Sequence, residues 1–326
     1  MKQLSLLACL LGCITIFSCK DDSSNPPPDP GTTEYVVGKN RFTIMVDGVE
    51  REYYVHVPLG YVKGTATPLV FMLHGTSGNG EEFYDHSGWK EVGETNNLLT
   101  VFPSSMKYCI IDAGQQKNTT KWNSQPAEWT FCAGEIPRDD IKFLRTVISE
   151  MQRKFNIDAK RIDLNGFSNG GQMAAKCAVE MSDVLAAVVS NASSFAFDTV
   201  YFPKRKLPVT FQVGNEDYGP GNVGPAIPLS MLDTLISTPN IPLLNGKHFR
   251  ITQTYIHSFD LNPNHTIIGD TSSAVVATFQ GKTADPLNIF RFVFVKGLAH
   301  SYPNGTNHPM EAAKLHWVWL KQFSLP

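Results

Sequence analysis

A glycine-rich turn around Ser168 joins a strand to a helix, and few folds accommodate such a junction. Residues 166–170 read Gly-Phe-Ser-Asn-Gly, between an apolar strand candidate at residues 161–164 and a run of helical spacing at residues 169–181. Small residues are needed beside the serine because a side chain there would collide with neighbouring backbone. The G-x-S-x-G spacing in this setting predicts a sharp elbow that lifts the serine hydroxyl above the end of a sheet. The alternative is a strand–helix turn with a purely structural role.

Strands and helices alternate along the chain from residue 41 to residue 326. Apolar residues at three- and four-residue intervals predict helices at residues 139–155 and 310–323. Continuous apolar runs predict strands buried on both faces at residues 68–73, 98–102, 185–189, 208–213 and 289–295. This alternation predicts an α/β fold with a mostly parallel, doubly wound sheet.

The beginning of this domain has a different pattern from the rest. Residues 41–46 and 52–57 alternate apolar with polar side chains, and Asp47-Gly48 lies between them. An Asp-Gly pair between two alternating segments is a strong signal for a tight β-turn. We therefore expect an antiparallel N-terminal hairpin at one edge of the sheet.

The composition excludes several classes of protein. Hydrophobic residues make up 42% of the chain and charged residues 18%, which is too apolar for a disordered protein. The formal net charge is −2, so no basic field is available to hold a nucleic acid. We expect a globular protein without a nucleic-acid partner.

The N-terminus predicts export and a lipid anchor. Residues 1–18 hold one lysine and an apolar run too short to span a bilayer, which is typical of a signal peptide. The run ends in Ile-Phe-Ser before Cys19, which resembles the lipobox of bacterial lipoproteins; Cys13 is a competing site, and ordinary secretion is the alternative. Residues 19–40 are acidic and proline-rich and predict an extended tether. We expect an extracytoplasmic chain attached to the outer membrane, with a periplasmic or an outward orientation.

Three cysteines remain in the expected mature domain. Cys109 and Cys132 both lie in a loop-rich region and are the expected disulfide pair, because an oxidising compartment favours one bridge. Cys177 lies in the predicted helix after the elbow and is expected to be a buried thiol. The cysteines and histidines show no metal-ligand spacing, so we expect no metal.

A nucleophilic serine needs a base and an acid, and in a chain of this order both follow it. His300 lies in a short loop directly after the last strong strand, whereas His308 and His316 lie at or in the closing helix. Asp217 follows the strand at residues 208–213 and is the expected acid, with Glu216 as the alternative. The acid would hold the imidazole in the tautomer that accepts the serine proton.

The serine also needs hydrogen-bond donors for the negative charge that develops on the substrate oxygen. A glycine-rich loop at residues 73–80 follows a predicted strand, where such donors belong. The backbone N–H groups of Thr76 and Asn169 are the two candidates. A glycine-rich strand exit without any such role is the alternative.

Four segments together resemble the extracellular polyhydroxybutyrate depolymerase and feruloyl esterase group of carbohydrate esterase family one. They are His-Gly-Thr at 74–76, Gly-Phe-Ser-Asn-Gly-Gly at 166–171, Gly-Asn-Glu-Asp at 214–217 and Gly-Leu-Ala-His at 297–300. The resemblance covers roughly residues 41–326. It implies an α/β-hydrolase fold, serine-esterase activity without a cofactor, and a place for Trp122 near the substrate.

The chain departs from this group after the acid. About eighty residues separate Asp217 from His300, and residues 219–282 predict a lid-like insertion. The resemblance also leaves the ester open. Feruloyl or acetyl esters of plant polysaccharide are the first expectation, and polyhydroxybutyrate is the second. A catalytically silent surface lipoprotein that binds glycan or polyester is the alternative from another class.

Overall fold

The computed structural model describes residues 35–326, except residues 113, 125–129, 196–199 and 239–245. The predicted signal peptide, Cys19 and nearly all of the tether lie outside the described residues. Within the described part of the chain, no helix is both long and apolar enough to cross a membrane.

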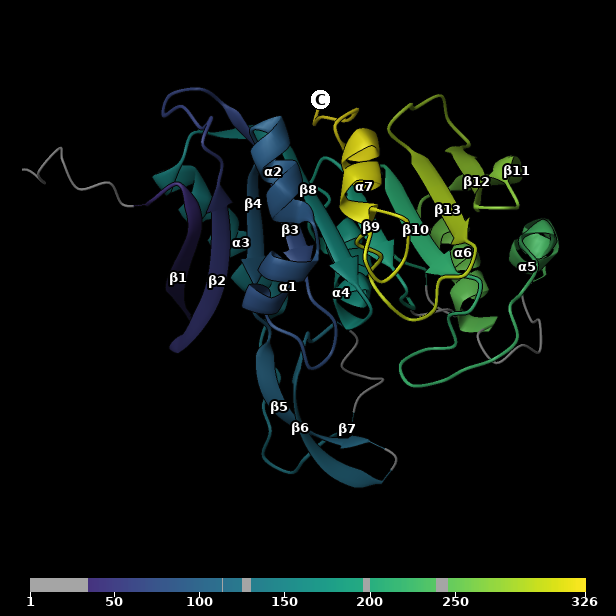
Figure 1. The fold of residues 1–326 in the computed structure, drawn as a ribbon, viewed down its shortest axis with the longest axis horizontal. Helices are drawn as coiled ribbons and strands as arrows, with labels where there is room; N and C mark the ends of the chain where they lie inside the picture. The colour runs from purple at the N-terminus through teal and green to yellow at the C-terminus, as the bar shows by residue number, and fades with distance from the viewer. Residues whose placement is uncertain (1–34, 113, 125–129, 196–199, 239–245) are drawn as a thin grey trace, which may run out of the picture. The chain divides into compact units, whose positions relative to one another are not determined.

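A ten-stranded sheet forms the middle layer of the domain, in the order β1-β2-β4-β3-β8-β9-β10-β13-β12-β11 (Figure 1). Its six central strands run parallel, and the four outer strands add antiparallel pairs at both edges. The strands span Gly38–Val46 (β1), Val49–Val57 (β2), Thr67–Leu73 (β3), Leu99–Pro103 (β4), Ile157–Phe167 (β8), Val188–Asn191 (β9), Val209–Gly214 (β10), Leu261–Asp270 (β11), Ala274–Gly281 (β12) and Ile289–Val295 (β13).

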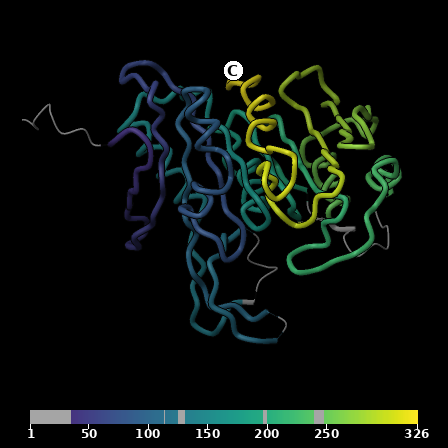
Figure 2. The backbone as a smooth tube through the Cα atoms, in the orientation of Figure 1, coloured from purple at the N-terminus to yellow at the C-terminus, as the bar shows by residue number. Residues whose placement is uncertain are grey.

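Helices cover both faces of this sheet. One face carries α1 (Gly80–His86), α2 (Trp89–Asn96) and α7 (Ala312–Leu320). The other face carries α3 (Asp140–Lys154), α4 (Asn169–Glu180), α5 (Leu232–Ser237) and α6 (Gly246–Ser258), and a short 3₁₀ turn, η2 (Leu229–Met231), precedes α5. The tube in Figure 2 shows that the early helices and the C-terminal helix, far apart in sequence, lie side by side. The predicted α/β fold with its doubly wound sheet and N-terminal hairpin is confirmed.

The central strands overlap the apolar runs that predicted them, although β9 begins at Val188, three residues later than expected. Every residue of β9 and of β10 is buried, as a strand between two helical layers requires. α3 begins where Asp139 caps it: the Asp139 carboxylate accepts a hydrogen bond from the Lys142 N–H at 2.9 Å. Its buried stripe then faces the sheet.

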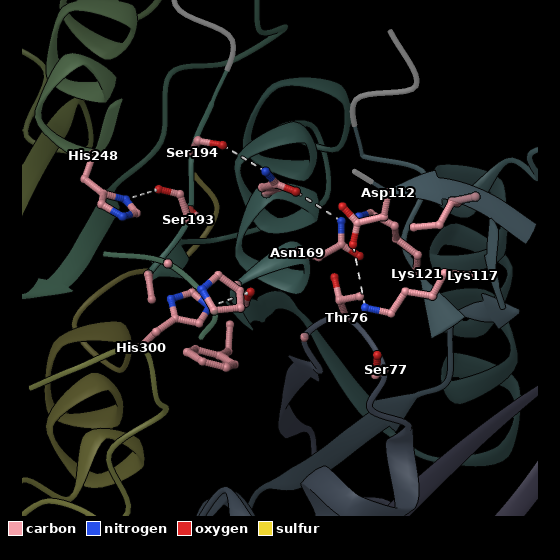
Figure 3. A pocket seen from close by; sticks show the side chains of 18 of the residues that line it. Thr76, Ser77, Asp112, Lys117, Lys121, Asn169, Ser193, Ser194, His248 and His300 are labelled. Carbon is pink, nitrogen blue, oxygen red and sulfur yellow. Dashed lines mark hydrogen bonds and ion pairs between the residues drawn. The ribbon is translucent and has the colours of Figure 1, made fainter. Parts of the chain in front are cut away.

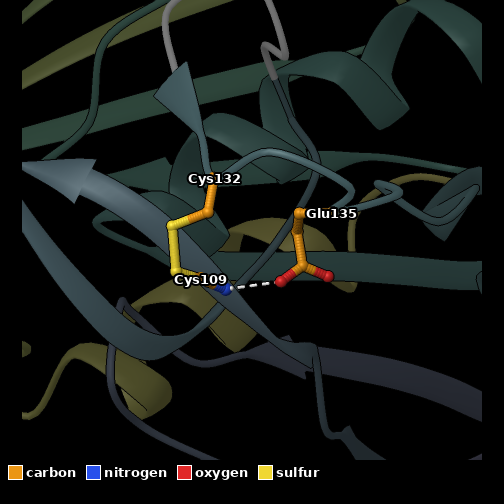
Figure 4. Close-up of a disulfide and its surroundings, with 3 residues drawn as sticks. All are labelled: Cys109, Cys132 and Glu135. Atoms are coloured by element: carbon orange, nitrogen blue, oxygen red, sulfur yellow. Dashed lines mark hydrogen bonds between the residues drawn. A yellow bond between two sulfur atoms is a disulfide. The ribbon is translucent and has the colours of Figure 1, made fainter.

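A small second sheet, which the sequence did not predict, projects from the carboxyl edge of the large one (Figure 1). It consists of β5 (Met106–Asp112), β6 (Gln115–Lys121) and β7 (Thr130–Phe131) in the order β6-β5-β7. The expected disulfide between Cys109 and Cys132 is present and ties β5 to the segment after β7 (Figure 4). Cys177 is a buried free thiol in α4, as expected.

The segment predicted as a lid-like insertion, residues 219–282, is largely built into the domain. β12 pairs with β13, β11 pairs with β12, and α6 buries aromatic side chains such as Phe249 and Tyr255 against the sheet. Three of its residues, Gly219, Pro220 and His248, line the cavity described below. That this segment acts as a lid stays a prediction.

Candidate active site

Ser168 lies on the elbow between β8 and α4, in a backbone conformation that residues with a side chain rarely adopt. Its φ is 54° and its ψ is −120°, which costs roughly 1–3 kcal/mol and persists only where the surroundings enforce it. The surrounding backbone is packed too closely for side chains. A Cβ on Gly166 would lie 2.1 Å from the Gly170 carbonyl oxygen, and one on Gly170 would lie 2.3 Å from that of His74. The glycines of the motif are therefore required by contact.

Three side chains from the carboxyl ends of different strands meet at this elbow. The Ser168 hydroxyl donates to His300 Nε2 at 2.9 Å. His300 Nδ1 in turn donates to the two carboxylate oxygens of Asp217, at 2.9 and 3.1 Å. β8, β10 and β13 are parallel and end at the same edge of the sheet, which brings together residues 132 and 83 positions apart. This is the geometry of a Ser-His-Asp triad.

Asp217 is buried, and its surroundings nonetheless keep it ionised. Burial alone would raise the pKa of the Asp217 carboxyl. The hydrogen bond from His300, the electrostatic influence of the His248 and His300 rings, and a 2.8 Å bond from the Gly219 N–H outweigh burial and lower that pKa. An ionised carboxylate holds Nδ1 of His300 protonated and leaves Nε2 free to accept the serine proton.

The alternatives to His300 and Asp217 lie elsewhere. Glu216 forms no hydrogen bond to His300; its backbone N–H donates to the Leu298 carbonyl. His308 contacts the Lys296 carbonyl on the surface, and His316 is buried in α7. Neither histidine lines the cavity at Ser168.

The two expected oxyanion donors lie on either side of the serine. Thr76 and Asn169 both line the cavity, and Asn169 is the first residue of α4, where N–H groups have no acceptor inside the helix. The loop that carries Thr76 passes close over the elbow: a Cβ on Gly75 would lie 3.2 Å from the Ser168 Cβ. The positions suit stabilisation of an oxyanion.

His74 holds that loop in place. Its Nε2 accepts from the Ser105 N–H at 2.9 Å, and its Nδ1 donates to the Gly75 carbonyl at 2.7 Å. Burial lowers the pKa of His74 to about 4, so the ring is neutral at pH 7. The two bonds specify one tautomer of a neutral ring.

Trp122 is not among the residues that line the cavity at Ser168, so the structure does not support the substrate contact that the resemblance implied. The side chain is fully buried, and its indole N–H donates to the His74 carbonyl at 2.9 Å. The Trp122 backbone N–H donates to the Asn169 side-chain oxygen at 2.6 Å. Trp122 therefore joins the loop of Thr76 to the first residue of α4. Trp129, a second tryptophan in the segment before α3, lies outside the described residues.

The cavity at Ser168 has a volume of about 560 Å³ and two walls that the sequence did not predict. One wall is the β5–β6 hairpin, which contributes Ile110, Lys117 and Lys121 (Figure 3). The other includes His248 of α6, whose Nδ1 donates to the Ser193 carbonyl at 2.8 Å and whose Nε2 lies 3.8 Å from an Asp217 oxygen. The polar sequence of β6 gave no signal that it lies beside the elbow.

The described residues hold no group of three His, Cys, Asp or Glu side chains suited to a metal ion. The site's chemistry can be derived from the triad residues and backbone donors alone. The expectation that no cofactor is needed stays a prediction.

Together, the sheet order and this site define an α/β-hydrolase fold that carries a serine–histidine–aspartate constellation. No protein-family model matches the chain. Its sequence is 24% identical over 285 residues to feruloyl esterase B of Piromyces equi, covering 85% of this chain and 46% of that protein. It is 27% identical over 135 residues to poly(3-hydroxyalkanoate) depolymerase C of Paucimonas lemoignei, covering 41% of this chain and 29% of that protein. The chain thus spans less than half of the length of either relative.

Solved structures show the same fold. Acetyl xylan esterase from Aspergillus awamori has a TM-score of 0.58 at 13% identity, covering 86% of this chain and 99% of that one. A poly(3-hydroxybutyrate) depolymerase from Bordetella parapertussis has a TM-score of 0.52 at 17% identity, covering 89% and 92%. The chain resembles esterases and depolymerases of the α/β-hydrolase fold, as the sequence motifs implied.

Proposed function

We propose that this protein is a serine carboxylic-ester hydrolase that acts through an acyl-enzyme. The observation that carries the proposal is the unbroken series of hydrogen bonds from Ser168 through His300 to Asp217, at 2.9 Å each. Relatives named as esterases and depolymerases support the same reaction class.

The proposed reaction begins when the Ser168 oxygen attacks the ester carbonyl carbon. His300 Nε2 takes the hydroxyl proton, and the N–H groups of Thr76 and Asn169 stabilise the oxyanion. The tetrahedral intermediate collapses, the C–O bond of the ester breaks, and His300 gives the proton to the departing alcohol. Water, deprotonated by His300, then attacks the acyl carbon and releases the acid and Ser168.

The proposed substrates are feruloyl or acetyl esters of plant polysaccharide. A relative named feruloyl esterase B and one named as a bifunctional acetylxylan esterase/xylanase support this choice. The cavity is large enough for an aromatic acyl group, and the projecting β5–β6 hairpin lines one side of it. Polyhydroxybutyrate is the second candidate, supported by relatives named as depolymerases.

Replacing Ser168 with Ala tests the reaction. We expect hydrolysis of an aryl acetate to fall by about 10³-fold or more, because the attacking oxygen is lost while the fold is kept. Ser149→Ala on the exposed side of α3 is the matched control and should keep full activity. Unchanged turnover in Ser168→Ala would exclude the mechanism.

A fluorophosphonate probe separates this proposal from a catalytically silent surface lipoprotein that binds glycan or polyester. The wild-type chain should be labelled and Ser168→Ala should not be. An unlabelled wild-type chain would favour the silent binder. Side-by-side hydrolysis of feruloylated xylan, acetylated xylan and polyhydroxybutyrate then identifies the ester.

We also propose that the protein is lipid-anchored and extracytoplasmic. The signal-like residues 1–18, the lipobox-like Cys19 and the Cys109–Cys132 disulfide, which favours an oxidising compartment, support this placement. Metabolic labelling with an alkyne palmitate should mark the wild-type chain and not Cys19→Ser. Equal labelling of both chains would contradict the anchor site, and Cys13→Ser tests the competing one.

A further inference from the structure

A second cavity lies on the face of the sheet that α7 covers. Its volume is about 290 Å³, and α7, β10, β12 and β13 enclose it. In Figure 1, α7 lies in front of the middle of the sheet, and β13 and β12 extend beyond it. This cavity shares no lining residue with the one at Ser168. It is therefore a separate site, and nothing in the proposed esterase reaction uses it.

A single guanidinium lines this cavity. Arg291 lies on β13, and its side chain packs over the ring of Trp319 with 5.6 Å between the guanidinium carbon and the ring centre. Among the described residues, no carboxylate lies close enough to form an ion pair with Arg291. Burial lowers the pKa of the Arg291 guanidinium. An arginine keeps its charge in proteins, and a half-buried charge without a counter-ion is costly.

Two further polar groups of the cavity are buried without a hydrogen-bond partner among the described residues. They are the Thr210 hydroxyl and the Gln212 side-chain nitrogen, both on β10, and Thr210 is the direct cross-strand partner of Arg291. Buried donors of this kind normally have a hydrogen-bond acceptor, so two donors without an acceptor beside a guanidinium indicate that a ligand binds there.

The buried His316 specifies which way the Gln212 amide faces. The Asn165 side-chain N–H donates to His316 Nδ1 at 2.8 Å, so His316 Nε2 carries the proton and donates to the Gln212 oxygen at 3.1 Å. The Gln212 nitrogen is therefore directed away from His316. Burial, then the charge of Arg291, lowers the pKa of His316 to about 3, so this ring is neutral. Among the residues that line the cavity, Arg291 supplies the positive charge.

The remaining walls are apolar. Val276 on β12 and Leu315 and Trp319 on α7 line the cavity, and Leu315 is 52% exposed. A ligand must therefore combine a compact anionic end with a hydrocarbon or aromatic body.

We infer that this cavity is a binding site for a small monocarboxylate with an apolar body. The planar guanidinium matches a carboxylate in two parallel N–H···O bonds. The donors on β10 lie beside it, and one cation balances one negative charge, whereas a phosphate dianion would leave charge uncompensated. The apolar walls would cover the rest of the ligand.

Calorimetric titration of the full chain with benzoate tests this site, and benzamide is the neutral control of the same shape. Wild type should bind benzoate, and benzamide should bind roughly 10- to 100-fold more weakly, because the charge-assisted bonds are lost. No benzoate binding at millimolar concentrations, or equal binding of both compounds, would overturn the inference.

Two variants locate the binding. Arg291→Met removes the charge with similar bulk and should weaken benzoate binding by roughly 10- to 100-fold. Val276→Phe fills the cavity while keeping Arg291, so it gives a second result if Arg291→Met does not fold. Lys314→Met is the matched control: it removes an exposed cation of α7 that does not line the cavity. Benzoate held at the Ser168 cavity would bind equally well to both cavity variants, and that result would contradict the proposal.

Discussion

Ser168 illustrates how close packing of the neighbouring backbone can hold a residue in an unfavourable backbone conformation. The backbone before and after it is pressed against neighbouring carbonyl groups, so glycine is the residue that fits at positions 166 and 170. The serine hydroxyl then projects toward His300 instead of capping α4, since no side-chain cap bond is present at this helix start. A residue favoured at helix N-termini is used here for its reactive oxygen.

Asp217→Asn should lower kcat by roughly 10⁴-fold with little change in KM. The substitution would remove the negative charge that fixes the His300 tautomer, while the shape of the site is kept. The measurement is steady-state hydrolysis of an aryl acetate, with a thermal melt to confirm folding. Glu216→Gln is the control, because the neighbouring carboxylate does not contact His300; a larger loss in Glu216→Gln would assign the acid to Glu216.

At the scale of elements, the strands that are buried on both faces could be predicted from the sequence, whereas strands whose position depends on pairing with a neighbour could not. The parallel strands are continuous apolar runs because both faces are covered, and loops at their carboxyl ends must meet. For this reason the G-x-S-x-G motif, the chain order and the predicted strand ends were enough to propose Ser168, Asp217 and His300 together. β6 has no such pattern: it reads Gln-Gln-Lys-Asn-Thr-Thr-Lys and is mostly exposed.

β11 was missed for a related reason. Pro263 lies in this strand, and a proline argues against a strand in the interior of a sheet. β11 is the edge strand, where an absent N–H costs no ladder bond.

The positions of His248 and Trp122 could not be predicted from the sequence either. Their places depend on tertiary packing, which put the histidine beside the triad and buried the tryptophan.

The disulfide is the element-scale constraint on the small sheet. Replacing both Cys109 and Cys132 with Ser should lower the free energy of unfolding of this sheet by about 3 kcal/mol, because a 23-residue loop is no longer closed. Amide hydrogen exchange in β5 and β6 should become faster, while exchange in β9 should not change. KM should rise more than kcat falls, because Ile110 and Lys117 line the cavity and do not contact the triad.

Cys177→Ala is the matched control for that experiment. Its thiol is buried in α4 and unpaired with the other cysteines, so its replacement should leave exchange in the small sheet unchanged. Unaltered exchange in the double serine variant would mean that strand pairing alone holds the hairpin.

At the scale of the whole molecule, two buried neutral histidines join the layers of the domain. His74 links the loop that carries Thr76 to Ser105, which lies between β4 and β5, and His316 links α7 to β8 and β10. Both rings must stay neutral to keep these bonds, because each uses one nitrogen as an acceptor. The stability of the domain is therefore coupled to pH through groups that take no part in catalysis.

Acidification should remove the stability that these two neutral histidines contribute, whereas buried Asp140 and Asp163, whose pKa values burial raises, act in the opposite direction. Burial lowers the folded-state pKa of His74 to about 4 and, together with Arg291, that of His316 to about 3, whereas the unfolded value is about 6.5. Between these values the unfolded chain binds more protons, so stability is complete above about pH 6.5 and falls as the pH decreases. Asp217 adds nothing in this window, because its pKa is lowered and its contribution is lost only under more acidic conditions. At pH 5 each histidine is protonated in the unfolded chain and neutral in the folded one, which should lower the free energy of unfolding by about 2 kcal/mol per histidine. The measurement is the difference in the urea unfolding free energy between pH 7.5 and 5.0. His316→Gln should remove its share of that difference, exposed His86→Gln should not, and an unchanged difference in His316→Gln would refute the assignment.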